Sequence, residues 1–288
     1  MIFDRNEKKE VVALLGAGSM GTAIVRKIAA GRKVLLGDIS EENLEKAKKE
    51  FQYSGYDVET FVVNALEKEA VEAFARKAAS LGPVMYYIHT AGASPHQTNP
   101  EHILKLDLLG TGYAVDAFGK VMAKGGAGLL ISSQTGYMYP IPYDVEQQIL
   151  AAPTEKLLDL PFMKEVAMQN SGIAYMVAKR VNHLQAMKAA ATTWKARRAR
   201  INTISPGVIV TPLAYDEFAA AGEGYQQMID ASAAQRVGTS EEIAEAAAFL
   251  LGEHAQFITG TDLLIDGGVI AAIRTGEYQL QEHHDAEA

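Results

Sequence analysis

The stretch LLGAGSMGTAI, residues 14–24, decides the fold class of this chain. It places Gly16, Gly18 and Gly21 in the spacing G-x-G-x-x-G, directly after an apolar run and at the start of a helical pattern. Glycines at this spacing permit a tight strand-to-helix turn and let backbone N–H groups approach a pyrophosphate, whose negative charge a helix N-terminus favours. Such turns also occur for packing reasons alone, so the surrounding sequence has to support a nucleotide-binding interpretation.

Short apolar runs alternate with helical patterns along the whole chain. The expected strands are residues 10–16, 33–38, 57–63, 83–90, 127–133, 199–207 and 262–268. The expected helices are residues 20–31, 40–51, 68–82, 101–124, 172–196 and 240–252. This alternation predicts a parallel sheet with helices on both faces. We therefore expect an α/β fold, a single doubly wound Rossmann domain over 1–288 with about seven strands, ending in a frayed tail at 275–288.

Composition narrows the class of protein. The chain has 288 residues, a formal net charge of −8 and no cysteine. Disulfides and thiolate metal sites are therefore excluded, and we expect no metal. No basic stripe extends beyond WKARRAR at 194–200, and no apolar run approaches the ~20 residues that span a bilayer. We expect a cytoplasmic protein with neither a nucleic-acid partner nor a membrane.

Asp38 supports the nucleotide-binding interpretation of the glycine turn. It ends the second expected strand, about 20 residues beyond the glycines, where an acidic side chain accepts hydrogen bonds from the adenosine ribose hydroxyls. A carboxylate at this position also repels a 2′-phosphate, which favours NAD over NADP. The alternative is that Asp38 only caps the helix at residue 40, a role that Ser40 already fills.

With these elements placed, the chain resembles the short-chain dehydrogenase/reductase family over residues 10–270, apart from 136–170. The resemblance rests on motifs in the family's order: HTAG (89–92), LLISSQTG (129–136), YMVAK (175–179), SPGVIVT (205–211) and a C-terminal pattern that ends in DGG (236–268). Each motif alone is weak evidence for the family, but the occurrence of all of them in the family's order is specific to it. The glycine turn is one residue shorter than in the family's dominant branch, which leaves its detailed contacts open.

The resemblance implies a set of catalytic roles. Tyr175 would exchange a proton with the substrate oxygen, although an unperturbed tyrosine has a pKa near 10, too high for a base at neutral pH. Lys179, one helical turn on, would favour the phenolate and hold the nicotinamide ribose. Ser133 would hydrogen-bond the substrate oxygen, with Ser132 as the reserve. Asp107 aligns with the family's catalytic asparagine, where it would bind a water in the proton path or change the pH dependence.

The resemblance also implies the cofactor contacts. The expected residues are Gly16, Gly18, Ser19, Met20, Gly21, Asp38, Ile39, Asn64, Ala65, Thr90, Ala91, Gly92, Tyr175, Lys179, Pro206, Gly207, Val208 and Thr211. Asn64 would lie near the adenine, and Thr211 near the nicotinamide carboxamide. A helix cap is the alternative role for Asn64 and for Thr211. Thr90 replaces the family's asparagine in the motif that follows the fourth strand.

The segment 136–170 breaks the strand–helix rhythm. It contains four prolines and no strand pattern, and it separates Ser133 from Tyr175 by 42 positions. We expect a lid or wall over the substrate pocket, because both ends of the segment adjoin catalytic positions. The expected lining residues are Tyr137, Met138, Tyr139, Ile141 and Tyr143, in addition to Ser133 and Tyr175. The alternative is an oligomerisation element, since helices four and five commonly build the family's subunit interface.

An insertion at this point resembles one in the hydroxysteroid dehydrogenase/carbonyl reductase branch of the family. The resemblance therefore implies an NAD-dependent oxidoreductase that interconverts a secondary alcohol and a ketone, on a bulky apolar substrate such as a hydroxysteroid. It also implies a homo-oligomer, a dimer or a tetramer. The alternatives are an NADP-dependent carbonyl reductase, a non-catalytic nucleotide-sensing protein, and an epimerase or dehydratase of a nucleotide sugar, which the DGG ending disfavours.

Overall fold

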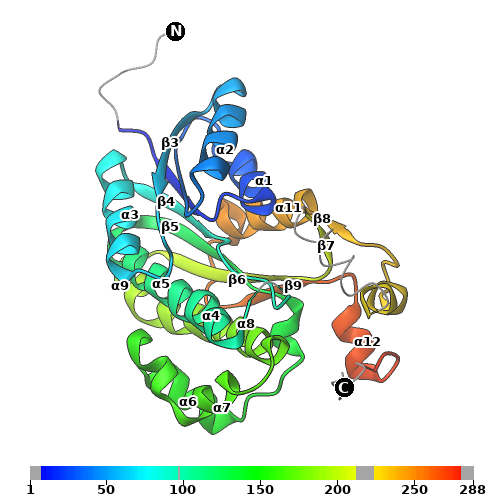
Figure 1. Ribbon diagram of the computed structural model, residues 1–288. Helices are drawn as coiled ribbons and strands as arrows, with labels where there is room; N and C mark the ends of the chain where they lie inside the picture. Colours follow the sequence, from blue (N-terminus) through cyan, green and yellow to red (C-terminus); the bar gives the residue numbers. More distant parts are fainter. Residues whose placement is uncertain (1–7, 97, 212–223, 280–288) are drawn as a thin grey trace.

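The computed structural model describes residues 8–96, 98–211 and 224–279. Its main feature is a seven-stranded parallel sheet in the order β3-β2-β1-β4-β5-β6-β9 (Figure 1). The strands are β1 (Val11–Leu15), β2 (Lys33–Asp38), β3 (Asp57–Val62), β4 (Val84–His89), β5 (Met122–Ile131), β6 (Arg200–Pro206) and β9 (Asp262–Ile265). The doubly wound fold is confirmed. Its strand order reverses between β1 and β4, and ligands of such sheets bind at that point, beyond the carboxyl ends of the strands.

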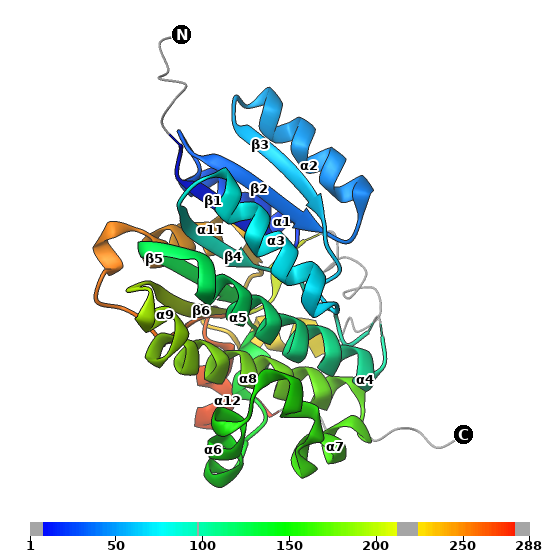
Figure 2. The same cartoon turned by 90° about the vertical axis from the view of Figure 1, so that its left-hand side faces the viewer.

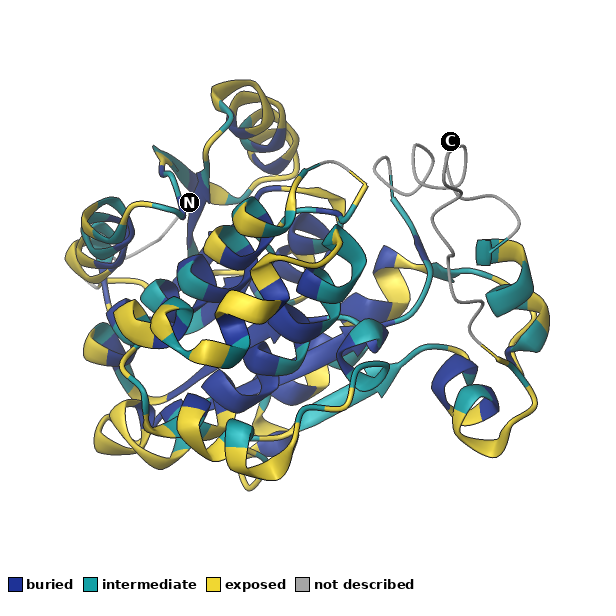
Figure 3. Cartoon of the chain, turned by 60° about the horizontal axis from the view of Figure 1, so that its bottom comes forward, coloured by how far each residue is buried: buried dark blue, intermediate teal, exposed yellow. Residues whose placement is uncertain are grey.

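Helices cover both faces of the sheet (Figure 2). The helices α1 (Ser19–Ile28), α2 (Glu41–Tyr53) and α11 (Ser240–Leu251) pack on one face, and α3 (Lys68–Leu81), α5 (Thr111–Val121) and α8 (Ser171–Ala191) pack on the other. Side chains of β1 alternate between the two cores: Val12 and Leu14 join the first, and Val11, Ala13 and Leu15 the second. Burial on both faces explains why these strands read as continuous apolar runs. In Figure 3 the buried residues concentrate in the sheet and on the inner sides of the helices.

Several element boundaries differ from the prediction. The expected helix at 101–124 is α4 (Pro100–Ile103), a π-helical segment η1 (Leu104–Gly110) and α5, and β5 already begins at Met122. The expected helix at 172–196 is divided into α8 and α9 (Thr193–Ala196). Three further short elements were not predicted: the parallel pair β7 (Ile209–Val210) and β8 (Gly238–Thr239), and the turn η4 (Glu253–Ala255). Helix α12 (Val269–Thr275) follows the DGG motif, and residues 280–288 of the expected tail lie outside the described part.

The segment between Ser133 and α8 folds as short helical pieces. These are η2 (Gln134–Tyr137), α6 (Tyr143–Ala151), η3 (Thr154–Asp159) and α7 (Pro161–Ala167), and Figure 1 shows α6 and α7 beneath α8 and α4. Their apolar side chains form a third core with α4, η1 and α8, to which the segment contributes Ile149, Leu157, Met163 and Val166. This third core buries the side of α8 that faces away from the sheet.

The predicted substrate wall stays a prediction. Tyr139 and Ile141, like Tyr175, are partly buried against the third core, and Tyr143 is 77% exposed. The segment packs on α8 because that helix has a long apolar surface there. A Cβ atom at Gly112 of α5 would lie 2.5 Å from Cγ2 of Thr154. The glycine therefore allows the segment to pack closely against α5.

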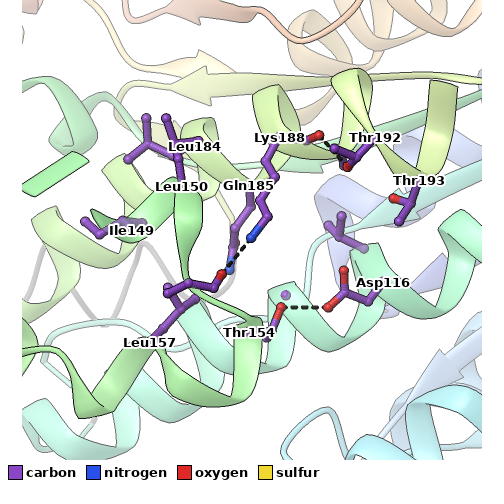
Figure 4. Close-up of a pocket in the computed structure, with 14 residues that line it drawn as sticks. Asp116, Ile149, Leu150, Thr154, Leu157, Leu184, Gln185, Lys188, Thr192 and Thr193 are labelled. Carbon is purple, nitrogen blue, oxygen red and sulfur yellow. Dashed lines mark hydrogen bonds between the residues drawn. The ribbon is translucent and has the colours of Figure 1, made fainter. Parts of the chain in front are cut away.

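A cavity of about 80 Å³ remains where the segment meets α5 and α8 (Figure 4). Thr154 donates a hydrogen bond to Asp116 across it (2.6 Å), and Lys188 Nζ donates to the carbonyl of Ala152 (2.6 Å). The segment is therefore held by polar as well as apolar contacts. Within the described ranges, no helix combines the length and apolar character needed to cross a bilayer.

Candidate active site

The parallel strands bring most predicted site residues to one edge of the sheet. Gly16, Asp38, Thr90, Ser133 and Gly207 lie at or just beyond the carboxyl ends of β1, β2, β4, β5 and β6. Among all predicted residues, the buried ones are Gly16, Gly21, Ala65, Asp107, Lys179 and Pro206. The half-buried ones are Met20, Asp38, Asn64, Thr90, Ala91, Ser133, Tyr137, Met138, Tyr139, Ile141, Tyr175, Gly207, Val208 and Thr211. Gly18, Ser19, Ile39, Gly92 and Tyr143 are exposed.

Gly16 is required by the protein's own packing. Its φ is +101°, and a Cβ atom there would lie 2.5 Å from the backbone nitrogen of Ala91. The hydroxyl of Thr90 donates to the carbonyl of Gly16 (2.6 Å) and so ties the end of β4 to the turn. Only glycine tolerates both the left-handed backbone and this close approach.

Gly18 has a different environment. A Cβ atom there would meet nothing within 4 Å, and this residue is the N-cap of α1, where no side chain accepts a hydrogen bond from the helix start. The first N–H groups of α1 therefore have no capping side chain. This arrangement fits the pyrophosphate of a dinucleotide.

The two glycines give a matched test of the turn. We expect Gly18→Ala to weaken NAD⁺ binding about tenfold, equivalent to about 1.4 kcal/mol, with little change in melting temperature, because the methyl group enters only the space left for the ligand. Gly16→Ala should lower the melting temperature instead, because its methyl group strikes the Ala91 backbone. Calorimetric titration and thermal unfolding measure the two effects. Unchanged affinity with a lowered melting temperature in Gly18→Ala would assign this residue to packing.

Asp38 is held in a fixed orientation at the end of β2. Its Oδ2 accepts a hydrogen bond from the N–H of Ala17 (2.8 Å), and its Oδ1 accepts one from the N–H of Ser40 (2.8 Å). Each oxygen keeps a second lone pair for a ribose hydroxyl. The neighbouring side chain of Ile39 is 65% exposed, and Val62, paired with Asp38 in the sheet, is 50% exposed. The carboxylate therefore stands beside an apolar surface.

Asn64 stabilises the turn that follows β3. Its Oδ1 accepts a hydrogen bond from the N–H of Leu66 (3.0 Å), and its Nδ2 donates to the carboxylate of Glu67 (2.9 Å). Glu67, not Asn64, is the N-cap residue of α3. Asn64 thus has a local structural role beside the one that the family resemblance implies.

Tyr175, Lys179 and Asp107 form the centre of the site. Tyr175 and Lys179 lie one turn apart on α8, and the ammonium of Lys179 is 5.0 Å from the centroid of the Tyr175 ring. The same ammonium donates a hydrogen bond to Oδ1 of Asp107 (3.1 Å). Lys179 and Asp107 are both buried, so this is an ion pair inside the protein.

Burial and the neighbouring charges shift the pKa values of Lys179 and Asp107 in opposite directions. Burial lowers the pKa of Lys179, but the Asp107 carboxylate and the Tyr175 phenol outweigh burial and leave it above its ordinary 10.5. Burial raises the pKa of Asp107 above its ordinary 3.8, although the Lys179 charge and the N–H of Ala93 oppose the rise. Lys179 therefore stays protonated at neutral pH, with its charge partly balanced by Asp107.

The loop after β4 is shaped around Asp107. The N–H of Ala93 donates to both carboxylate oxygens (3.2 Å each), and a Cβ atom at Gly92 would lie 2.3 Å from Oδ1. Gly92 therefore leaves the space that the Asp107–Lys179 pair occupies. This role is separate from the cofactor contact that the family resemblance implies for Gly92. Asp107 lies in the π-helical segment η1, and such irregular turns are frequent at functional sites.

The two adjacent serines have different environments. The hydroxyl of Ser132 is buried and donates to the carbonyl of Lys179 (2.8 Å), which fastens the end of β5 to α8. Ser133 is half-buried, and its oxygen accepts a hydrogen bond from the N–H of Thr135 (3.2 Å). The Ser133 hydroxyl keeps its own proton to donate, which suits the role that the family resemblance implies.

A buried polar network beside the site was not predicted. Tyr137 donates a hydrogen bond to Asp262 of β9 (2.6 Å), Ser205 donates to the same carboxylate (2.9 Å), and His183 Nε2 lies 2.8 Å from the Ser205 hydroxyl. Burial lowers the pKa of His183 to about 4, so its ring is neutral at neutral pH. The Tyr137 hydroxyl is thus bound to β9, a contact that the sequence did not predict. Tyr137 and Asp262 are 125 positions apart, and no local pattern signals such a pair.

This fold and this cluster of residues define the class of dinucleotide-dependent oxidoreductases. Residues 10–143 match the family described as "short chain dehydrogenase", and residues 150–270 match "Enoyl-(Acyl carrier protein) reductase". The chain is 40% identical over 266 residues to the short-chain dehydrogenase/reductase bsc3 of Alternaria brassicicola, covering 91% of this chain and 96% of that one. The chain therefore belongs to the short-chain dehydrogenase/reductase family, whose members are NAD(P)-dependent oxidoreductases acting on CH–OH groups.

More distant similarities agree with this assignment. The chain is 26% identical to galactitol 2-dehydrogenase (L-tagatose-forming) of Cereibacter sphaeroides, over 89% of this chain and 93% of the relative. A solved short-chain dehydrogenase/reductase from Serratia marcescens BCRC 10948 has a TM-score of 0.71 at 22% identity, and the match covers 92% of this chain and 98% of that structure. The latter similarity concerns the fold alone.

Proposed function

We propose that this protein is an NAD(H)-dependent oxidoreductase that interconverts a secondary alcohol and a ketone, with Tyr175 as the acid/base. The observation that supports it most is the grouping of Tyr175, Lys179 and Asp107, with Ser132, the neighbour of Ser133, hydrogen-bonded to the Lys179 carbonyl. In such a site a protonated lysine next to a phenol favours its ionised form, which makes the phenol a usable base.

Each side chain has a distinct task in this reaction. The Ser133 hydroxyl donates a hydrogen bond to the substrate oxygen. Tyr175 takes the proton of an alcohol during oxidation and returns a proton to the oxygen during reduction. Lys179, kept protonated by Asp107, supplies the positive charge beside the phenol. The bound nicotinamide supplies or accepts the hydride.

The cofactor is proposed to lie along the strand ends. The N–H groups at the start of α1, next to Gly18, hold the pyrophosphate, and Asp38 holds the adenosine ribose. Exposed Ile39 and the turn at Asn64 and Ala65 border the adenine. The nicotinamide side is formed by residues 90–92, by Lys179, and by Pro206, Gly207, Val208 and Thr211.

Asp38 makes the choice between the two dinucleotides testable. We expect kcat/KM for NAD⁺ to exceed that for NADP⁺ about tenfold or more, because the fixed carboxylate repels a 2′-phosphate, a difference of about 1.4 kcal/mol or more. Asp38→Asn should lower the ratio of kcat/KM for NAD⁺ to kcat/KM for NADP⁺, since an amide still accepts hydrogen bonds but carries no charge. Initial rates with both cofactors measure the ratio. A clear preference of the parent protein for NADP⁺ would refute this role.

The expectation of a bulky apolar substrate rests on the resemblance of the insertion to the hydroxysteroid dehydrogenase/carbonyl reductase branch. Tyr139, Ile141 and the apolar residues of α6 and α7 pack against α8 and α4, so the packing of segment 136–170 adds no support to it. The proposed enzyme works in the cytoplasm as a homo-oligomer. The stretch 149–157 lies against α5 and α8, so one side of the segment is covered within the chain.

A substrate panel tests the proposed function. The reduction of NAD⁺ and NADP⁺ is followed with secondary alcohols and polyols, and the oxidation of the reduced cofactors with the matching ketones. Turnover of at least one pair, lost in Tyr175→Phe, supports the proposal. Tight NAD⁺ binding without turnover of any pair would favour the nucleotide-sensing alternative instead.

A further inference from the structure

Two buried oxygen atoms next to Ser133 have no hydrogen-bond partner. Throughout the described part of the chain, the only buried side-chain polar atoms without one are Oε1 of Gln134 and Oγ1 of Thr135. These two residues directly follow Ser133 in the sequence. Buried polar groups of native proteins are almost always paired, so an exception calls for a physical reason. Its place beside the reaction centre points to a ligand.

The Gln134 carboxamide is the stronger of the two features. The side chain is buried, and its Nε2 has only the sulfur of Met228 as a partner, at 3.8 Å. A thioether is a weak acceptor. Turning the amide by 180° exchanges its oxygen and nitrogen but still leaves one polar atom unpaired. The carboxamide therefore offers an acceptor without a partner and a donor whose only partner is a weak one.

The backbone of Gln134 is held in place on both sides. The N–H of Gly136 donates to the carbonyl of Ser133 (3.0 Å), and Tyr137 is anchored to Asp262 on β9. A Cβ atom at Gly136 would lie only 3.1 Å from the backbone nitrogen of Arg180, so this turn is also pressed against α8. The backbone of this turn is fixed, whereas the Met228 side chain that contacts the amide is flexible and can move aside for a ligand.

The cavity between segment 149–157, α5 and α8 does not carry a comparable argument. In the cavity of Figure 4, Asp116 and Lys188 are both paired within the protein. That cavity needs no ligand to satisfy its charges, whereas the amide beside Ser133 does.

We propose that Gln134 determines specificity by binding a second hydroxyl of the substrate, on the carbon next to the reacting one. This inference rests on the proposed function. Ser133 and Gln134 are consecutive, with Cα atoms about 3.8 Å apart, so one substrate molecule can reach both side chains. A hydroxyl both donates and accepts, as the carboxamide does. The substrate class is therefore a vicinal diol in one direction and an α-hydroxy ketone in the other.

The test compares trans-1,2-cyclohexanediol with cyclohexanol, which lacks only the second hydroxyl. The parent protein should prefer the diol. Gln134→Met keeps the length of the side chain but removes its hydrogen bonds, and we expect it to lower kcat/KM for the diol about tenfold to a hundredfold. Its kcat/KM for cyclohexanol should change less than about threefold. The melting temperature should stay or rise, because the protein itself loses no strong hydrogen bond.

A matched control and the contrary outcomes separate this inference from the proposed function. Gln52→Met makes the same change on the exposed surface of α2 and should alter neither rate. Equal losses on both alcohols in Gln134→Met, a lowered melting temperature, or a parent protein that prefers cyclohexanol would overturn the inference alone. A parent protein that turns over no alcohol of the panel with either cofactor would overturn the proposed function as well.

Discussion

Tyr175→Phe lowers kcat for alcohol oxidation by about 10³-fold, since proton transfer by a positioned side chain contributes roughly 10²–10⁴-fold. The substitution removes only the phenol oxygen. The ring keeps its place on α8, 5.0 Å from the Lys179 ammonium, so neither the fold nor NAD⁺ affinity should change. Steady-state rates across pH 6–10 measure the loss, and calorimetric titration with NAD⁺ shows that the site is intact.

The control for this prediction lies in the same part of the chain. Tyr143→Phe removes the same atom from a side chain that is 77% exposed and packs in no core, so its rates should equal those of the parent. If Tyr175→Phe turned over as fast as the parent, another group would be the acid/base and the proposed mechanism would be wrong.

Lys179→Met lowers the free energy of unfolding by about 3–5 kcal/mol at neutral pH, the range found when one member of a buried ion pair is removed. Methionine fills much of the lysine's volume, so the loss comes mainly from the Asp107 carboxylate, which stays buried without its ammonium. Turnover should be lost as well, because no positive charge remains beside Tyr175. Chemical denaturation at several pH values measures the stability.

The pH dependence of this loss has a definite sign. In the variant burial still raises the pKa of Asp107, and only the Ala93 N–H and His102 still oppose the rise, so its folded-state pKa is raised further above the ordinary 3.8 of the unfolded chain. Between these two values the folded protein binds more protons than the unfolded one, so stability falls as pH rises. The deficit of Lys179→Met is therefore smallest near pH 4 and complete above the folded-state pKa of Asp107.

A double variant separates stability from chemistry. Lys179→Met/Asp107→Asn removes the buried charge but keeps an oxygen that accepts from the Ala93 N–H. We expect it to recover more than half of the lost stability at neutral pH and none of the activity. A single variant as stable as the parent, or a double variant less stable than the single one, would show that the ion pair does not hold this part of the fold.

Much of the fold could be predicted because its signals are local. All seven strands of the sheet were expected, since each is an apolar run followed by a turn or a helical pattern. Ser40 was expected as an N-cap and accepts the N–H of Asn43. The π-helical turn at 104–110 was missed, because a change of helical pitch leaves the apolar pattern nearly intact. The two-residue strands β7 and β8 are too short to show any period.

The place of the segment 136–170 could not be predicted in full, because its own pattern does not say which surface it meets. Its prolines and the absence of a strand pattern predicted a break in the strand–helix rhythm, and the segment folds as short helical pieces. Its ends adjoin catalytic positions, which suggested a wall over the substrate. The apolar side chains of the segment pack on α8 and α4. That apolar surface exists only in the folded chain.

The sequence by itself determined the sheet, the glycine turn and the Tyr175–Lys179 spacing, because these depend on residues a few positions apart and on the fixed geometry of strands and helices. Tertiary structure alone decided that Lys179 meets Asp107, 72 positions away, and that the amide of Gln134 is buried without a partner. The reason is physical: the charge balance at a buried ammonium and the pairing of a buried amide depend on atoms within a few ångströms, and distant parts of the chain supply those atoms.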